Sequence, residues 1–300
     1  MPSTKSKTKP KPSLELTFEA IGTQWSIELF GLDRMPDGLS EAIQQRIAVY
    51  DKNYSRFRDD SLVAEMSRTA GNYLLPDDAQ PLFDLYHKLY ELTDGAVTPL
   101  IGQVMVEAGY DASYSLQPKQ LHQPPAWDEV LDYQYPNVHL KQPALLDVGA
   151  AGKGYLVDIV AGILEEFGAT AYCVDAGGDM VCHGPQSLRV GLEHPDQPDE
   201  VIGIVELENH ALCGSAGNRR KWANFHHIID PKSLHSPVHL KAVWVLAESA
   251  LLADGLATAL FFVAPAKLMK HYTFSYVLVR ADNSLEHSQP FPAEFFTGES

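Results

Sequence analysis

An aspartate and a threonine, Asp254 and Thr258, lie four residues apart in the apolar segment LLADGLATAL. Because an α-helix makes one turn in about 3.6 residues, both side chains project from the same face of a helix. A carboxylate and a hydroxyl are hard oxygen donors of the kind that bind Mg²⁺. Spacing alone favours an alternative in which Thr258 bonds back to the carbonyl of Asp254. An aspartate in an otherwise apolar helix is costly without a partner, however, and this tilts the interpretation towards a metal site.

Two adjacent histidines form a second candidate group in the segment FHHIIDPKS, which runs from Phe225 to Ser233. Neighbouring residues of a strand point to opposite faces, so at most one histidine reaches a given pocket. We assign His227 to the site, as a general base or as a hydrogen-bond donor to a phosphate. We assign His226 to a satisfied, partly buried position, which is also the alternative for His227.

The glycine-rich segment DVGAAGKGY joins an apolar strand to a helix. Backbone amides at such a helix N-terminus can bind phosphate oxygens, and Lys153 adds a cation there. The spacing is not that of a Walker A loop, and a plain tight turn is the alternative. Two further segments are less specific: Arg219 to Lys221 form an exposed basic turn, and Asp179 is as well explained as a turn former as a ligand.

The elements that position these residues follow from periodicity. Alternation predicts a hairpin around Gly22, and helical spacing predicts several amphipathic helices. Strands and helices alternate without a regular βαβ rhythm, so we expect an α+β fold with mixed or antiparallel sheets and packed helices. We expect a disordered basic tail over 1–13 and a surface insertion over 113–136. The other predicted elements are helices within 40–57, 81–95, 152–168 and 248–263, and strands within 170–178, 187–193, 201–208, 241–247 and 273–284.

Composition limits the class of protein. The formal net charge is −16, which argues against a general nucleic-acid binder. No apolar run is long enough for a membrane span, so we expect no membrane insertion. The three cysteines form no CxxC pair, so we expect them to be reduced. The segment MPSTKSKTKPKPS has no hydrophobic stretch typical of a secretory signal, so we expect a cytoplasmic protein.

Five segments, in order, resemble the ApbE family, the flavin transferases that move FMN from FAD onto a threonine or serine of a protein. These segments are YSRFRDDSLVAEMSR, LDVGAAGKGYLVDIVAGIL, VDAGGDM, HHIIDPKS and LADGLATAL. The resemblance spans roughly 19–265. It implies that 14–300 form one ApbE-like, T-fold-like domain with a nucleotide cleft, which agrees with the α+β expectation.

The resemblance also implies roles for individual residues. Mg²⁺ would be bound by Asp254, Thr258 and the backbone carbonyl of Ala150, and His227 would assist the transfer. Contacts to the flavin nucleotide are implied at Ile21, Tyr54, Ala96, Val97, Thr98, Asp147, Lys153 and Ile228.

Two segments depart from the family pattern. Val97-Thr98 stands where the family has Phe-Asp, so stacking and a polar contact are expected to change. Leu234 stands where the family has glycine, so that turn is expected to differ.

The expected reaction is a Mg²⁺-dependent transfer of FMN from FAD to an acceptor protein, with release of AMP and with His227 and Asp254 as catalytic residues. Two alternatives stay open at this stage. Water could replace the acceptor hydroxyl, which would make the protein an FAD pyrophosphatase. The chain could also be an FAD-binding module without turnover.

Overall fold

Alternating apolar and polar residues near the N-terminus form a hairpin, as predicted. In the computed structural model, which describes residues 11–218 and 220–296, β1 (Leu14–Ala20) pairs with β2 (Thr23–Leu29) in antiparallel fashion. Ile21 and Gly22 form the turn with φ of +45° and +76°. Positive φ at both central residues suits a two-residue hairpin, because the turn then follows the twist of the strands. The predicted basic tail lies outside the described residues over 1–10.

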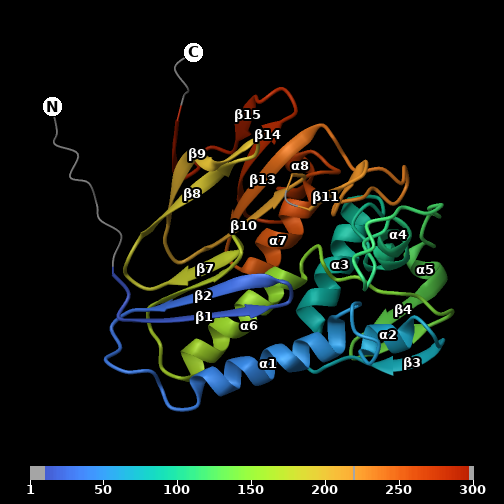
Figure 1. Ribbon diagram of the computed structural model, residues 1–300, viewed down its shortest axis with the longest axis horizontal. Coiled ribbons are helices and arrows are strands. Elements are labelled where there is room, and N and C mark those ends of the chain that lie inside the picture. The colour runs from blue at the N-terminus through green and yellow to red at the C-terminus, as the bar shows by residue number, and fades with distance from the viewer. Residues whose placement is uncertain (1–10, 219, 297–300) are drawn as a thin grey trace.

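The hairpin is one edge of an eight-stranded sheet with the order β1-β2-β6-β7-β10-β13-β14-β15, visible from blue to red in Figure 1. Every neighbouring pair of strands in it is antiparallel. The remaining strands of this sheet are β6 (Tyr172–Ala176), β7 (Met180–His183), β10 (Ala211–Ala216), β13 (Leu240–Ala247), β14 (Ser275–Arg280) and β15 (Leu285–His287).

Successive residues of the central strands belong to different cores, because they point to opposite faces of the sheet. Cys213 and Val245 pack with the helices in the main core, whereas Leu212 and Leu246 pack in a second core against a small sheet. That small sheet contains β8 (Leu188–His194), β9 (Gln197–Leu207) and β16 (Ala293–Phe295). Helices therefore cover one face of the large sheet and strands cover the other.

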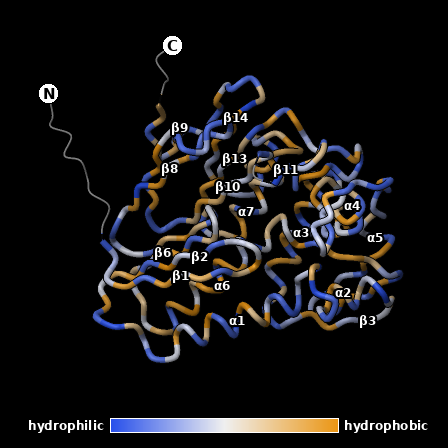
Figure 2. Tube along the Cα trace, in the orientation of Figure 1, coloured by the Kyte–Doolittle hydropathy of each residue, from blue (hydrophilic) through white to orange (hydrophobic). Residues whose placement is uncertain are grey.

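Two helices of the main core, α6 (Gly152–Glu166) and α7 (Ala250–Ala259), pack closely together. Figure 2 shows hydrophobic residues in succession along α6, as expected for a buried helix. A Cβ atom at Gly154 would lie 2.0 Å from the carbonyl oxygen of Ala250, so only glycine permits this approach. The other helices are α1 (Leu39–Tyr54), α2 (Leu62–Met66), α3 (Gln80–Leu92), the 3₁₀ helix η1 (Pro99–Ile101), α4 (Gly102–Glu107), α5 (Trp127–Val130) and α8 (Pro265–Leu268).

The α+β prediction with antiparallel sheets is thus confirmed. Within the predicted insertion, 113–126 contain no helix or strand, whereas 127–134 form α5 and β4. The remaining strands are β3 (Gly71–Leu74), β4 (Leu131–Gln134) and β5 (Asn137–Leu140), which form one sheet, and the pair β11 (Lys221–Trp222) and β12 (Phe225–His226). In the described part of the chain, no helix combines the length and the hydropathy that crossing a membrane requires.

The prediction of three reduced cysteines is wrong for two of them. Cys173 and Cys182 are directly opposite each other on β6 and β7 and form a disulfide. Directly opposed residues of an antiparallel pair have close Cβ atoms, and the spacing of these residues in the sequence did not reveal this pairing. Cys213 is free and buried.

Candidate active site

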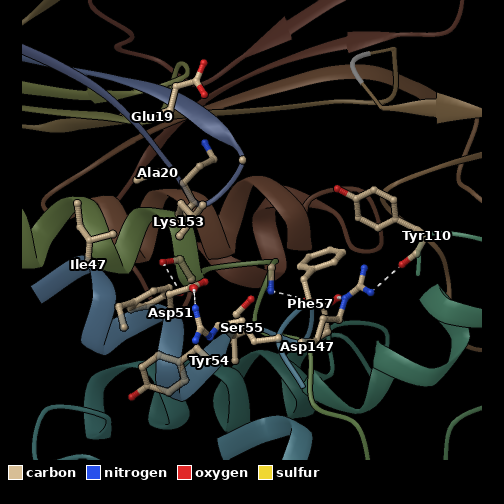
Figure 3. A pocket seen from close by; sticks show the side chains of 18 of the residues that line it. Glu19, Ala20, Ile47, Asp51, Tyr54, Ser55, Phe57, Tyr110, Asp147 and Lys153 are labelled. Carbon is tan, nitrogen blue, oxygen red and sulfur yellow. Dashed lines mark hydrogen bonds and ion pairs between the residues drawn. The ribbon is translucent and has the colours of Figure 1, made fainter. Parts of the chain in front are cut away.

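Two cavities meet between the helices, the β1–β2 turn and the segment that precedes β11. The large cavity, of about 980 Å³, extends along the β1–β2 turn and the end of α1, and Figure 3 shows part of its wall. The small cavity, of about 440 Å³, lies over α7. Some residues line both cavities, and we call this group the neck. The neck consists of Gly22, Arg56, Phe57, Tyr110, Asp147, Gly149, Lys153 and Arg220.

The oxygens predicted to bind a metal come together in the small cavity. Asp254, Thr258 and Ala150 all line it. The hydroxyl of Thr258 donates to the carbonyl oxygen of Ala150 at 3.2 Å, so it does not bond back to Asp254. A carboxylate, a hydroxyl and a carbonyl are a suitable donor set for Mg²⁺. No group of three His, Cys, Asp or Glu side chains suited to a metal occurs within the described ranges, so a site here depends on mixed oxygen donors.

Asp254 is a buried carboxyl group, only 5% exposed, at the contact between α6 and α7. One carboxylate oxygen accepts the amide of Gly154 at 2.9 Å. Burial, and then the nearby charge of Asp179, raise the pKa of Asp254 well above its ordinary value, although Lys153 opposes this rise. A bound cation would favour the charged form of this carboxyl group, so the environment of Asp254 suits a metal ligand.

Lys153 is already engaged within the protein. Its ammonium group forms an ion pair with Asp179 and donates to the carbonyl of Ala176 at 3.2 Å. Burial by itself would lower the pKa of Lys153, but the charges of Asp179 and Asp254 raise it on balance. Asp179 is 1% exposed and also accepts the amide of Gly214 at 3.1 Å. Asp179 is therefore a partner of Lys153 at the β6–β7 turn.

Most amides of the glycine-rich turn bind groups of the protein itself, which favours the alternative of a tight turn over a cradle of backbone amides for phosphate. Side chains of two buried tyrosines and two aspartates form hydrogen bonds with the backbone of this turn. Gly149 donates to Asp147 at 2.7 Å, Ala150 to Tyr86 at 3.0 Å and Gly154 to Asp254 at 2.9 Å, while Tyr50 donates to the Gly152 carbonyl at 2.9 Å. Gly152 and Ala151 both donate to the carbonyl of Val148. Few amides of the turn are therefore left for an anion, and side chains should contribute to anion binding at this site.

The two histidines have different environments, as predicted. His226 is buried, with Nε2 at 2.9 Å from the carbonyl of Pro237, and its Nδ1 accepts the amide of Ile228 at 3.3 Å. His227 lines the small cavity, and its Nδ1 is buried without a hydrogen-bond partner. Burial, and then the charge of Arg220, lower the pKa of His227 to about 3. The imidazole of His227 is therefore neutral at pH 7.

The other predicted nucleotide contacts line the two cavities, although their roles stay predictions. Ile21 and Tyr54 line the large cavity, and Figure 3 shows Tyr54 on its wall. Ala96, Val97, Thr98 and Ile228 line the small cavity, and Asp147 and Lys153 line both. Thr98 already accepts the amide of Leu100 at 3.2 Å, as the N-cap of η1.

The match to a family follows this arrangement. The ApbE family model matches residues 21–276 of the chain. This range includes the whole lining of the small cavity, all but Phe18, Glu19 and Ala20 of the large one, and the close contact of α6 with α7.

The chain belongs to the ApbE family.

Relatives of known name extend this match. A Haemophilus influenzae protein named FAD:protein FMN transferase is 29% identical in an alignment of 223 residues, with 65% of this chain and 64% of that protein covered. The chain thus spans just under two thirds of the length of this relative. A Klebsiella pneumoniae protein of the same name is 25% identical and covers 83% of this chain and 78% of its own length. The crystal structure of the ApbE protein of Thermotoga maritima has the same fold, with a TM-score of 0.80 and 23% identity over 94% of this chain and 99% of that one.

Several residues of this ApbE site were not predicted from the sequence as functional. Asp158 accepts the amides of Ala250 and Leu251, both at 2.8 Å, and thereby fixes the start of α7. Burial raises the pKa of Asp158 to about 6. Arg56 and Arg220 lie in the neck, although the sequence analysis interpreted Arg220 as part of an exposed basic turn. Lys221, another member of that basic turn, lines the large cavity, and Arg219 lies outside the described residues.

The turn after HHIIDPKS keeps the backbone conformation that glycine adopts easily. Leu234 has a φ of +59°, and its amide donates to the carbonyl of Asp230 at 2.8 Å. The side chain packs against a small core formed by Trp222, Ile229 and their neighbours. Packing of this apolar side chain offsets the cost of a left-handed backbone, which is about 1–2 kcal/mol for a residue other than glycine.

Proposed function

We propose that this ApbE protein transfers FMN from FAD to a threonine or serine hydroxyl of an acceptor protein and releases AMP. The observation that carries the proposal is the gathering of the Asp254, Thr258 and Ala150 oxygens in a small cavity that shares a neck with a larger one. The larger cavity, of about 980 Å³, has the size of a cofactor site. Two relatives bear the name of this activity, which supports the same reaction here.

The proposal includes Mg²⁺ as a cofactor, held by Asp254, Thr258 and the Ala150 carbonyl. When bound, the ion would neutralise charge on the diphosphate and polarise it for attack. The carboxyl group of Asp254 supports this assignment, because it is buried with a raised pKa and a bound cation would stabilise its charged form. Gly154 orients that carboxyl group through its amide.

His227 is the proposed general base. A new bond forms between the acceptor oxygen and the FMN-side phosphorus, and the bond from that phosphorus to the oxygen of AMP breaks. The proton of the acceptor hydroxyl passes to the imidazole, and AMP leaves with the bridging oxygen. A neutral imidazole that lines the small cavity can accept this proton. Burial keeps the imidazole neutral at pH 7 but weakens it as a base, and the negative charge of a bound diphosphate would raise its pKa again.

The experiment is an incubation of the protein with FAD, Mg²⁺ and a candidate acceptor protein. Flavin fluorescence on the denatured acceptor, together with AMP, is the expected result. AMP with free FMN would instead indicate an FAD pyrophosphatase, and binding without either product would indicate a flavin-binding module.

Asp254→Asn tests the metal assignment in the same assay. Asparagine keeps an oxygen for the Gly154 amide but removes the charge, so we expect transfer to fall by about a hundredfold or more. Asp132→Asn, at an exposed position outside both cavities, is the matched control and should transfer at the wild-type rate. Wild-type transfer by Asp254→Asn would remove the metal assignment.

A cytoplasmic location and a cytoplasmic acceptor remain part of the proposal. The Cys173–Cys182 disulfide is unusual for that compartment, where thiols are kept reduced. Fractionation of cells that produce the protein tests the location directly.

A further inference from the structure

FAD carries a diphosphate whose two negative charges must be offset when it binds. Two of the expected sources of positive charge already have partners in the described site. Most amides of the glycine-rich turn bind groups of the protein, and Lys153 is paired with Asp179. Cations besides the proposed Mg²⁺ should therefore take part, and they should lie where the two cavities meet.

Arg220 lies at that position. Its side chain is exposed and lines both cavities, and within the described part of the chain no carboxylate forms an ion pair with it. Its Nη1 donates to the hydroxyl of Tyr110 at 3.3 Å. The guanidinium charge also acts on both Asp254 and His227, which places it close to the proposed reaction centre.

Arg56 supplies a second cation beside it. Arg56 is 8% exposed, and its Nε donates to Asp147 at 2.5 Å while its Nη1 donates to the Tyr110 carbonyl at 2.7 Å. Its Nη2 is buried without a hydrogen-bond partner among the described residues. A buried N–H of a charged group without a partner is costly, so it indicates a missing acceptor.

Tyr110 holds the two arginines in place. Its backbone oxygen binds Arg56 and its hydroxyl binds Arg220. The tyrosine ring stacks on Trp222 at 5.4 Å, and the Arg56 guanidinium lies 5.0 Å from the ring centre. Figure 3 shows Tyr110, Phe57 and Asp147 together on this side of the large cavity. A packed aromatic support of this kind fixes the direction of the guanidinium groups before a ligand binds.

We propose that Arg220 and the Nη2 group of Arg56 form the subsite that binds the diphosphate of FAD at the neck. This inference rests on the proposed function, and it assigns the site a diphosphate ester as its ligand. Guanidinium groups suit this task, because their planar N–H groups match phosphate oxygens in pairs. Arg220 would also offset the charge that develops on AMP as the bond to phosphorus breaks.

The test is the affinity of Arg220→Met for FAD and for riboflavin, which has no phosphate, measured by titration calorimetry without Mg²⁺. We expect FAD to bind about tenfold to a hundredfold more weakly than to the wild type, and riboflavin to bind equally well. Arg189→Met is the matched control, because Arg189 is a partly exposed arginine on β8 outside both cavities. This control should bind both ligands as the wild type does.

Two outcomes would overturn the subsite: unchanged FAD affinity in Arg220→Met, or an equal loss of affinity for riboflavin. The second outcome would assign Arg220 a structural role. Arg56→Lys keeps a charge for Asp147 but removes Nη2, so it should weaken FAD binding by several-fold, and unchanged binding would remove Arg56 from the subsite. Because binding is measured apart from turnover, a wild type that binds FAD through Arg220 without transferring FMN would refute only the proposed function.

Discussion

Charged side chains at this site are paired so that few positive groups remain available. Arg56 is bound to Asp147, and Lys153 is bound to Asp179. Among the described residues, Asp254 accepts the Gly154 amide but forms no ion pair, although it is buried. Retaining a buried carboxyl group in an apolar helix costs stability, which is typical of residues kept for function.

The residue-scale prediction concerns His227 and pH. The pKa of His227 is about 3 in the folded protein, against 6.5 for an ordinary histidine, so below pH 6.5 the unfolded chain binds a proton that the folded protein does not. The stabilisation of the folded protein by the neutral His227 is therefore fully present above pH 6.5. It decreases as the pH falls from 6.5 towards 3. Between pH 7 and pH 5, we expect the free energy of unfolding of the wild type to fall by on the order of 2 kcal/mol more than that of His227→Gln.

Urea denaturation of both proteins at the two pH values measures this difference. Equal losses in the wild type and in His227→Gln would show that the imidazole titrates normally and would weaken its assignment as a neutral base.

At the scale of elements, the site depends on how closely two helices approach. The amide of Gly154 on α6 reaches Asp254 on α7 because glycine leaves no Cβ atom between them. Asp158 then fixes the N-terminus of α7 by accepting two of its amides. The position of the proposed metal ligands therefore follows from helix packing.

Gly154→Ala tests this contact. The added Cβ would meet the backbone oxygen of Ala250 at 2.0 Å, so the helices must separate, and we expect a loss of about 3 kcal/mol in the free energy of unfolding. Gly162→Ala, on the same helix with nothing within 4 Å of its Cβ, should instead gain roughly 0.5–1 kcal/mol. Chemical denaturation measures both values, and similar values for the two variants would contradict the close contact.

At the scale of the whole molecule, the two cavities draw on segments from most of the chain. The β1–β2 turn, the end of α1, the glycine-rich turn, the residues before β11 and α7 all contribute to their walls. Most buried residues of these segments belong to one continuous hydrophobic core. A ligand in the cavities therefore contacts parts that unfold together.

FAD should for this reason stabilise the molecule as a unit. At a free concentration of about a hundred times its Kd, FAD should raise the free energy of unfolding by about 2.7 kcal/mol. We expect one thermal transition that moves to higher temperature as a whole. Calorimetry in the presence of FAD measures this shift, and a split transition in which only one part moves would show that the cavity walls unfold independently.

The sequence by itself determined the local features. Periodicity predicted the hairpin at Gly22 and the helix that carries Asp254 and Thr258, because both patterns depend on neighbouring residues. Strand alternation likewise separated His226 from His227. Residue types alone also indicated oxygen donors for a metal.

Only the tertiary structure decided which groups these residues meet. The Thr258 hydroxyl bonds to Ala150, 108 residues away, and Arg56 and Arg220 meet at Tyr110. Most amides of the glycine-rich turn bind groups of the protein itself, which their local pattern did not reveal. The physical reason is that hydrogen bonds and ion pairs between distant segments depend on how the core packs, which local sequence patterns do not encode.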